Sequence, residues 1–235
     1  MDLANIKYWK HHSKTNCVFV ENNDSPLISI DFWFKAGISF EEKEKVGLAH
    51  FLEHMIFKGS KLLKPGEFDL RIEALGGFSN ASTGYDDVHY YVDIPPSNFE
   101  EALSLLTNLV LFPNLNEKEF DLEKKVIIEE ILQSKDQKDE LIFNYFLKSI
   151  WLEHPYAKSI LGEEENINKL TLVDLQNFHK KHYIPTNSCI SIAGKLPKNH
   201  IEICKKCELQ EFKINFINSK EIFIDKKSIK IGREI

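Results

Sequence analysis

The chain has 235 residues, of which 43% are hydrophobic, 28% charged and 11% aromatic. This composition excludes a disordered chain, which would be poor in apolar residues, and 10 Gly and 8 Pro are too few for a collagen-like or low-complexity chain. The formal net charge of -6 argues against a general nucleic-acid binder, because such domains are usually strongly basic.

The first half of the chain predicts pairs of strands separated by two helices. Runs of β-branched and aromatic residues predict the strands, and an apolar spacing of three to four residues predicts the helices. Gly76 and Gly77 end the second helix in the way typical of helix C-termini. In chain order the predicted elements are strands 16–22 and 26–36, helices 46–57 and 67–75, and strands 78–82 and 88–94.

The second half of the chain is mainly helical. Asn116 can cap a helix that has Glu119 at the capping-box position, and Thr171 with Asp174 is a second start of this kind. The order of strands and helices predicts an α+β fold, with a mixed or antiparallel β-sheet packed against several helices. The predicted elements here are helices 99–111, 117–135, 139–151 and 171–182, and strands 187–193 and 221–235.

The sharpest chemical feature is the segment His50-Phe51-Leu52-Glu53-His54. On a helix, positions i and i+4 share a face, so His50 and His54 can both reach one metal ion, with Glu53 on the neighbouring edge. Two imidazoles and one adjacent carboxylate match a catalytic zinc site that lacks its third ligand. The alternative is a surface helix with two unrelated histidines, which the apolar flanking residues disfavour.

A third ligand must come from another element. The best candidate lies in segment 126–131, which contains Glu129 and Glu130, on the predicted helix 117–135. Glu123 lies two turns before Glu130 on the same face of that helix, where a second carboxylate can orient a metal ligand. On local evidence alone, the alternative of a solvated charged helix face is favoured.

Together these residues resemble the pitrilysin-type zinc peptidases of family M16, the inverzincins. Members carry the inverted motif HxxEH and a ligating glutamate about 75 residues later. The chain is most similar to the processing-peptidase branch, which includes bacterial homologues and the β subunit of the mitochondrial enzyme. The similar segments are GLAHFLEHMIFKGS (47–60), EALGGFSNASTGYDDVHYYVDI (73–94), EKKVIIEEI (123–131), HPYAKSILG (154–162) and 170–194.

The resemblance implies one Zn²⁺ per chain, with His50, His54 and Glu130 as its ligands. Glu130 is preferred to Glu129 because its place in the motif fits the family spacing. The resemblance also implies that Glu53 is the general base.

In the same way the resemblance implies that Glu123 is a supporting acid behind the ligands. Asn80 and Ala81 match the edge strand that binds the substrate backbone in the family. The implied domain organisation is a single pitrilysin-type N-terminal catalytic domain at 1–220, one half of a peptidase clamp. Segment 221–235 would then be the start of a linker or of a second half that is cut short.

The implied function is that of a zinc-dependent endopeptidase acting on extended oligopeptides or presequence-like peptides, with water activated by zinc and Glu53. Expected partners are a peptide substrate and a second homologous half-domain in cis or in trans, or a second copy in a homodimer. The alternative is a non-catalytic or partner-dependent peptide-binding subunit of a processing-peptidase-like assembly. The intact motif disfavours that alternative, because non-catalytic subunits usually lose motif residues.

The compartment is indicated by what the sequence lacks. No run reaches the roughly 18 apolar residues of a membrane span, and the N-terminal residues 1–14 lack the apolar region of a secretory signal. The 4 cysteines are too scattered for a disulfide framework, and the pair Cys204 and Cys207 is most simply two incidental thiols. We therefore expect a cytoplasmic protein with no membrane association and no nucleic-acid partner.

Overall fold

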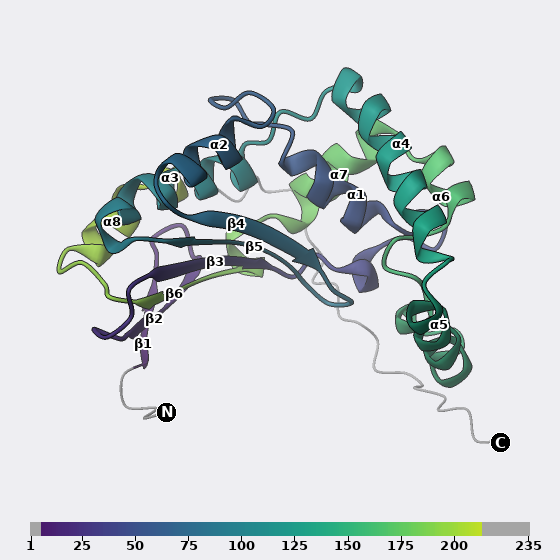
Figure 1. Ribbon diagram of the computed structural model, residues 1–235, viewed down its shortest axis with the longest axis horizontal. Helices are drawn as coiled ribbons and strands as arrows, with labels where there is room; N and C mark the ends of the chain where they lie inside the picture. Colours follow the sequence, from purple (N-terminus) through teal and green to yellow (C-terminus); the bar gives the residue numbers. More distant parts are fainter. Residues whose placement is uncertain (1–5, 213–235) are drawn as a thin grey trace.

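The computed structural model describes residues 6–212 (Figure 1). The predicted strand at 221–235 and the predicted domain end at 220 lie outside these residues. The strands are β1 (Ile6–Lys10), β2 (Asn16–Glu21), β3 (Ile28–Phe34), β4 (Phe78–Thr83), β5 (Val88–Ile94) and β6 (Ser188–Gly194). The α-helices are α1 (Leu48–Ile56), α2 (Glu67–Ala74), α3 (Phe99–Leu111), α4 (Glu117–Ser134), α5 (Lys138–Trp151), α6 (Glu164–Lys169), α7 (Leu172–His182) and α8 (His200–Lys206).

The described strands form one mixed sheet in the spatial order β1-β2-β6-β3-β5-β4. Strand β6 runs parallel to β2 and antiparallel to β3, so it separates two strands that are neighbours in the sequence. Strand β4 lies at one edge of the sheet and pairs with β5 alone. The α+β fold with a mixed sheet and several helices is therefore confirmed.

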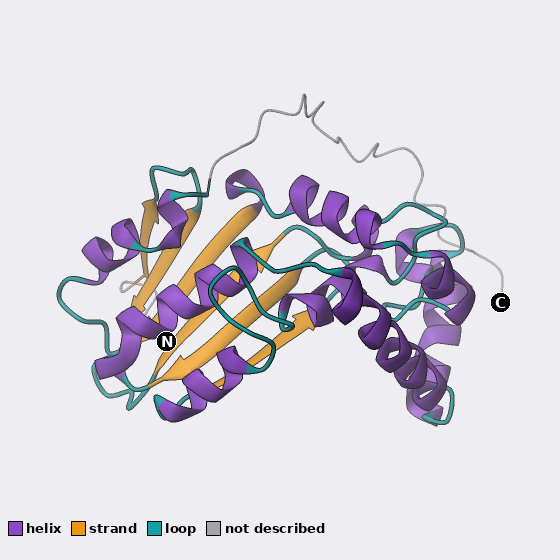
Figure 2. Ribbon diagram, turned by 90° about the horizontal axis from the view of Figure 1, so that it is seen from above, coloured by secondary structure: helices purple, strands orange, loops and turns teal. Residues whose placement is uncertain are grey.

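Helices α1, α2, α3 and α7 lie over one face of the sheet, which Figures 1 and 2 show from two directions. In β3, β5 and β6 every second residue is buried and the residues between are half-exposed. This alternation is what a strand with one covered face requires. Phe32 and Phe34 of β3 and Phe51 and Met55 of α1 are fully buried in the resulting core.

Several helix ends follow from local sequence. The side chain of Asn116 accepts a hydrogen bond from the N–H of Glu119 at 3.1 Å, and Thr171 and Asp174 form a capping box. Gly76 follows α2 with a φ of 78°, which glycine adopts at little cost. These helix boundaries agree with the sequence-based predictions to within one residue.

Three short elements, β1, α6 and α8, are not evident from the sequence. Helices α6 and α8 have six and seven residues, which is too short for an apolar period to stand out. Strand β1 has a largely exposed pattern without clean alternation. Helix α5 projects away from the sheet and has no buried residue (Figure 1). Among the described helices, none combines the length and the apolar character needed to cross a membrane.

Candidate metal centre

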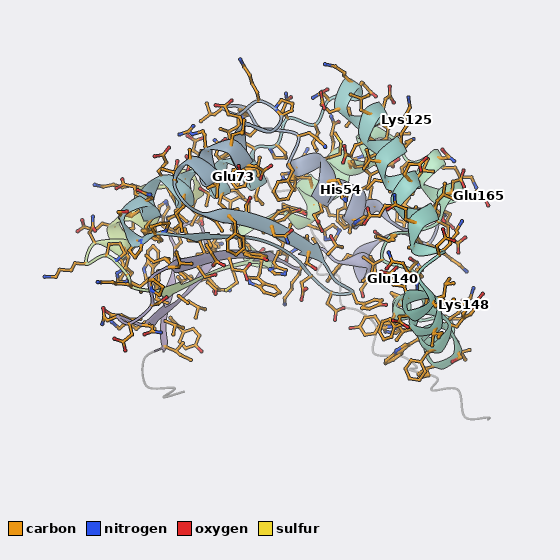
Figure 3. The ribbon with its side chains drawn as sticks, in the orientation of Figure 1. His54, Glu73, Lys125, Glu140, Lys148 and Glu165 are labelled. Carbon is orange, nitrogen blue, oxygen red and sulfur yellow. The ribbon has the colours of Figure 1, made fainter. Side chains whose placement is uncertain are left out.

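Helix α1 places His50 and His54 on one face, as their spacing predicts. Their ring centroids lie 4.7 Å apart with an interplanar angle of 68°. Helix α4 packs beside α1, and Figure 3 shows His54 between the sheet layer and α4. The two imidazoles therefore lie near the side chains of α4 that point toward α1.

Glu130 of α4 is the acid that meets the two histidines. Its Oε2 lies 3.7 Å from Nε2 of His50 and 3.4 Å from Nε2 of His54. One ligand atom from each of these three residues lies within 4.8 Å of the others, and no second group of this kind is found in residues 6–212. Glu129, the other candidate, is exposed.

Glu123 is not part of the group formed by His50, His54 and Glu130, but it contacts His54. Nδ1–H of His54 donates to Oε1 of Glu123 at 2.9 Å, and Nζ of Lys58 lies 2.7 Å from Oε2. Burial acts to raise the pKa of Glu123, but the hydrogen bonds from His54 and Lys58 more than offset it and hold the pKa below its usual range. The acid is therefore ionised, and its bond leaves Nε2 of His54 as the free ring nitrogen.

His50 is buried, with only 7% of its surface exposed. Burial, with a smaller contribution from His54, lowers the pKa of His50 to about 3, so its imidazole is neutral at neutral pH. Two histidine nitrogens and one carboxylate are the donor set of catalytic zinc sites that keep one position open. The residues present therefore fit a zinc ion on the chemistry of their donors.

Glu53 stands beside this group and is half-buried. The hydroxyl of Thr83, at the end of β4, donates to Oε2 of Glu53 at 2.5 Å. Burial raises the pKa of Glu53, whereas the hydrogen bond from Thr83 acts in the opposite direction. Strand β4, which ends at Thr83, thus orients the carboxylate of Glu53, three positions after His50.

An open cavity of about 540 Å³ begins at the metal centre. His50, Glu53 and Glu130 form one wall, Ala81 to Thr83 of β4 form a second, and residues from α4 and α5 with segment 159–161 complete it. Figure 3 shows Glu140, one of these residues, at the start of α5. The edge strand β4 and the metal centre therefore share one cavity.

The structure places Asn80 and Ala81 on β4 in different settings. Ala81 faces the cavity, whereas the side chain of Asn80 is exposed. The N–H of Ala81 donates to Oδ1 of Asn80 at 2.9 Å. The Asn80 side chain therefore occupies the acceptor position at this N–H.

Two residues of the centre were missed in the sequence analysis, Thr83 and Lys58. Lys58 lies just after the end of α1, and its partner Glu123 is on α4, so helical spacing does not join them. Thr83 lies within the similar segment 73–94, but its partner Glu53 lies 30 residues away, and no local pattern joins them.

The cysteine pair plays no part in this centre. Cys204 and Cys207 are buried as free thiols on and just after α8, at the end of the sheet away from α4 (Figure 1). Burial raises the pKa of Cys207 to about 12 and that of Cys204 further, so both are protonated at neutral pH.

Comparison with known proteins places this geometry in a family. The sequence model of the insulinase family, peptidase family M16, matches residues 17–164. The chain is 33% identical over 195 residues to a zinc protease, PqqE, of Helicobacter pylori, covering 79% of this chain and 44% of that protein. It is 32% identical over 180 residues to a probable mitochondrial-processing peptidase subunit beta of Arabidopsis thaliana, covering 77% of this chain and 34% of that protein.

Solved structures agree with the sequence comparison. A protease from Helicobacter pylori matches with a TM-score of 0.85 and 29% identity, covering 91% of this chain and 52% of that one. The first half of the periplasmic protease PqqL from Escherichia coli matches in fold with a TM-score of 0.81 at 19% identity, covering 91% of this chain and 47% of that one. The chain thus spans about half the length, or less, of the relatives that it matches.

Proposed function

The chain belongs to the insulinase family, peptidase family M16, and on that premise we propose that it is the zinc-binding half of an endopeptidase that cleaves extended peptides. The observation that carries the proposal is the meeting of His50, His54 and Glu130 beside the carboxylate of Glu53. Relatives named zinc proteases support the choice of zinc.

In this proposal His50, His54 and Glu130 hold one Zn²⁺. When bound, zinc supplies Lewis-acid polarisation of the scissile carbonyl and of the attacking water. Glu53 accepts a proton from that water and later donates it to the leaving amine. Thr83 holds one oxygen of Glu53, so the carboxylate stays oriented while the proton moves.

The substrate binds as an extended strand along the edge of β4. The edge position of β4 supports this, because β5 occupies only one of its two sides. Main-chain hydrogen bonds to such an edge bind peptides of many sequences. The N–H of Ala81 is one donor for this contact once Asn80 releases it, and the cavity beside Ala81 leads to Glu53.

The partner in this proposal is a second homologous half, in cis or in trans. The support is that the chain covers only about half of each matched structure, 52% of one and 47% of another. Helix α5 exposes Ile142, Tyr145 and Phe146 at 67%, 72% and 56%, an apolar face that a second half would cover. Ile142→Asp with Phe146→Asp should block assembly with that half and leave zinc binding unchanged.

The domain limits of 1–220 and the linker at 221–235 remain part of this proposal. So does the cytoplasmic location.

Cleavage of an internally quenched basic peptide by the zinc-loaded chain tests the proposal. The chain is assayed alone and mixed with the second half of a matched relative, and Glu53→Gln is the control. We expect Glu53→Gln to bind zinc normally and to lose turnover by about 100-fold or more, since general-base catalysis contributes that much.

A non-catalytic peptide-binding subunit is the alternative, and one matched fold is described as an inactive M16 domain. Zinc binding without turnover, either alone or in the mixture, would support that alternative and overturn the proposed catalysis. Failure to bind zinc would overturn the metal centre itself.

A further inference from the structure

The first turn of α1 is capped from outside the helix. Gly47, the residue before the helix, has a φ of 92° and no side chain with which to cap the turn. Glu41 supplies the missing acceptors: its Oε2 accepts the N–H of Gly47 at 3.0 Å and its Oε1 accepts the N–H of Ala49 at 2.7 Å. The carboxyl group of Glu41 thus satisfies two N–H groups at the start of the helix, where such groups lack intrahelical partners.

This contact lies directly before the first histidine. Ala49 precedes His50, so the bond to Glu41 acts on the turn from which His50 projects. Segment 161–162 packs closely against Gly47, because a Cβ at this position would lie only 2.7 Å from the carbonyl oxygen of Leu161. Helix α1 has nine residues, so its ends make up much of its length.

The position of Glu41 also carries an energetic cost, because its carboxyl group is partly removed from water. Burial raises the pKa of the Glu41 carboxyl to about 8, and the hydrogen bonds from Ala49 and Gly47, with the charge of Lys158, act in the opposite direction. A half-buried acid placed on two backbone donors fits a specific structural task, because its burial without those donors would be unfavourable.

We propose that Glu41 is a positioning residue of the metal centre, holding the first turn of α1 in the orientation at which His50 meets Glu130. The inference rests on the proposed metal centre and adds a residue that lies nine positions before the first ligand. His50 and Glu130 come from different helices, so their separation depends on how α1 is rotated against α4. A small change in that rotation moves one ligand away from the other.

The substitution Glu41→Gln tests the role with little change in volume. The amide has one acceptor oxygen, and its NH₂ group would face the second backbone N–H. A matched control is Glu208→Gln, because Glu208 also accepts two hydrogen bonds, from Ser104 at 2.6 Å and Thr107 at 2.8 Å. That acid follows α8, at the other end of the sheet (Figure 1).

Zinc affinity is measured by competition with a chelator, and stability by denaturant unfolding of the metal-free chain. We expect Glu41→Gln to weaken zinc binding about 10-fold, the lower end of what residues supporting metal ligands contribute. Glu208→Gln should bind zinc like the wild type even where it lowers stability as much. The visible spectrum of bound Co²⁺ should change in Glu41→Gln and not in Glu208→Gln.

Four results would overturn the inference. Equal zinc affinity of Glu41→Gln and the wild type would remove the positioning role and leave the metal centre standing. Equal losses of zinc affinity in Glu41→Gln and Glu208→Gln would mean that the effect reflects general stability and not positioning. A wild-type chain that binds no zinc would overturn the proposed function and this inference together. Amide exchange at Ala49 is followed in the metal-free chain, and slow exchange retained in Glu41→Gln would show that Glu41 does not hold the turn.

Discussion

Glu123 accepts a hydrogen bond from Nδ1–H of His54 across 2.9 Å, although the two residues are 69 positions apart. The bond leaves Nε2 of His54 directed at Glu130, 3.4 Å away. Lys58 contacts the other oxygen of Glu123, so the acid is held from both sides. The orientation of one candidate ligand therefore depends on a residue that is not a ligand itself.

Substitution of Glu123 should weaken zinc binding without removing a ligand. Glu123→Ala frees the His54 ring and leaves Lys58 without its buried partner, and we expect a loss of affinity of about 10- to 100-fold. Chelator competition measures this loss. Asp121→Ala, at an exposed position on the same helix, is the control and should bind zinc normally. An unchanged affinity in Glu123→Ala would show that the hydrogen bond does not support the site.

The two neighbouring acids of α4 should behave differently. Glu130→Gln replaces the carboxylate that lies 3.4 Å and 3.7 Å from the two histidine nitrogens, so zinc binding should fall by more than 100-fold. Glu129→Gln changes an exposed carboxylate and should leave binding intact. Metal content after dialysis against a weak chelator distinguishes the two variants. The reverse result would assign the third ligand to Glu129.

Two glycines in left-handed conformations should differ in their tolerance of alanine. At Gly47, φ is 92° and a Cβ would lie 2.7 Å from the Leu161 oxygen and 2.8 Å from Cδ1 of Ile167, so Gly47→Ala should cost roughly 2–5 kcal/mol. Gly66 has φ of 76° and no atom within 4 Å of the Cβ position, so Gly66→Ala should cost only roughly 1–2 kcal/mol. Denaturant midpoints measure both values, and equal costs would contradict the close packing at Gly47.

The chain should lose stability in mild acid through buried histidines. Burial, with a contribution from Lys181, lowers the pKa of His182 to about 4 from the model-peptide value of 6.5. The folded state therefore favours the neutral ring, and this stabilisation is complete above pH 6.5 and is lost as the pH falls through 4. Denaturant unfolding between pH 7 and 4 measures the loss.

His182→Phe is the variant that tests this assignment. The ring packs on Phe178 and Phe40 with centroid distances of 4.4 Å and 5.4 Å, so phenylalanine can occupy a similar apolar setting. The variant should show a shallower dependence of stability on pH. An identical slope would mean that other groups carry the acid sensitivity.

The edge of β4 should govern substrate affinity and not zinc affinity. Ala81→Pro removes the N–H that would bind the substrate backbone, and proline is tolerated on the open side of an edge strand. We expect KM for an extended peptide to rise about 5-fold, since one hydrogen bond contributes on the order of 1 kcal/mol. Zinc affinity of the same variant is the control. An unchanged KM would place the substrate elsewhere.

Much of the fold follows from local sequence, and the part that does not has a common cause. Strands β3 and β5 and helix α3 are evident in the sequence because apolar alternation and helical periodicity act within a few residues. The placement of β6 between β2 and β3 carries no local signal, because it joins segments about 170 residues apart. Pairing partners of that kind are chosen by the packing of the whole sheet.

In the candidate site, too, some residues are predictable from local sequence and others are not. The pair His50 and His54 is readable from its spacing, because one helix turn brings them together. Thr83, Glu41 and Lys58 were missed because each acts through a contact with another element or with backbone atoms. Glu123 was singled out by its helical position relative to Glu130, but its hydrogen bond to His54 could be seen only in three dimensions.

Strand β6 is the last strand of the described sheet to be synthesised, yet it fills the middle of that sheet. Until residue 194 has emerged from the ribosome, β2 and β3 each present an unpaired edge, and the two pieces of sheet have no strand between them. Unpaired edges of this kind invite association between nascent chains. An excised fragment that stops at 164, where the family match ends, would carry both open edges permanently, so any shorter piece made for experiment has to extend beyond β6.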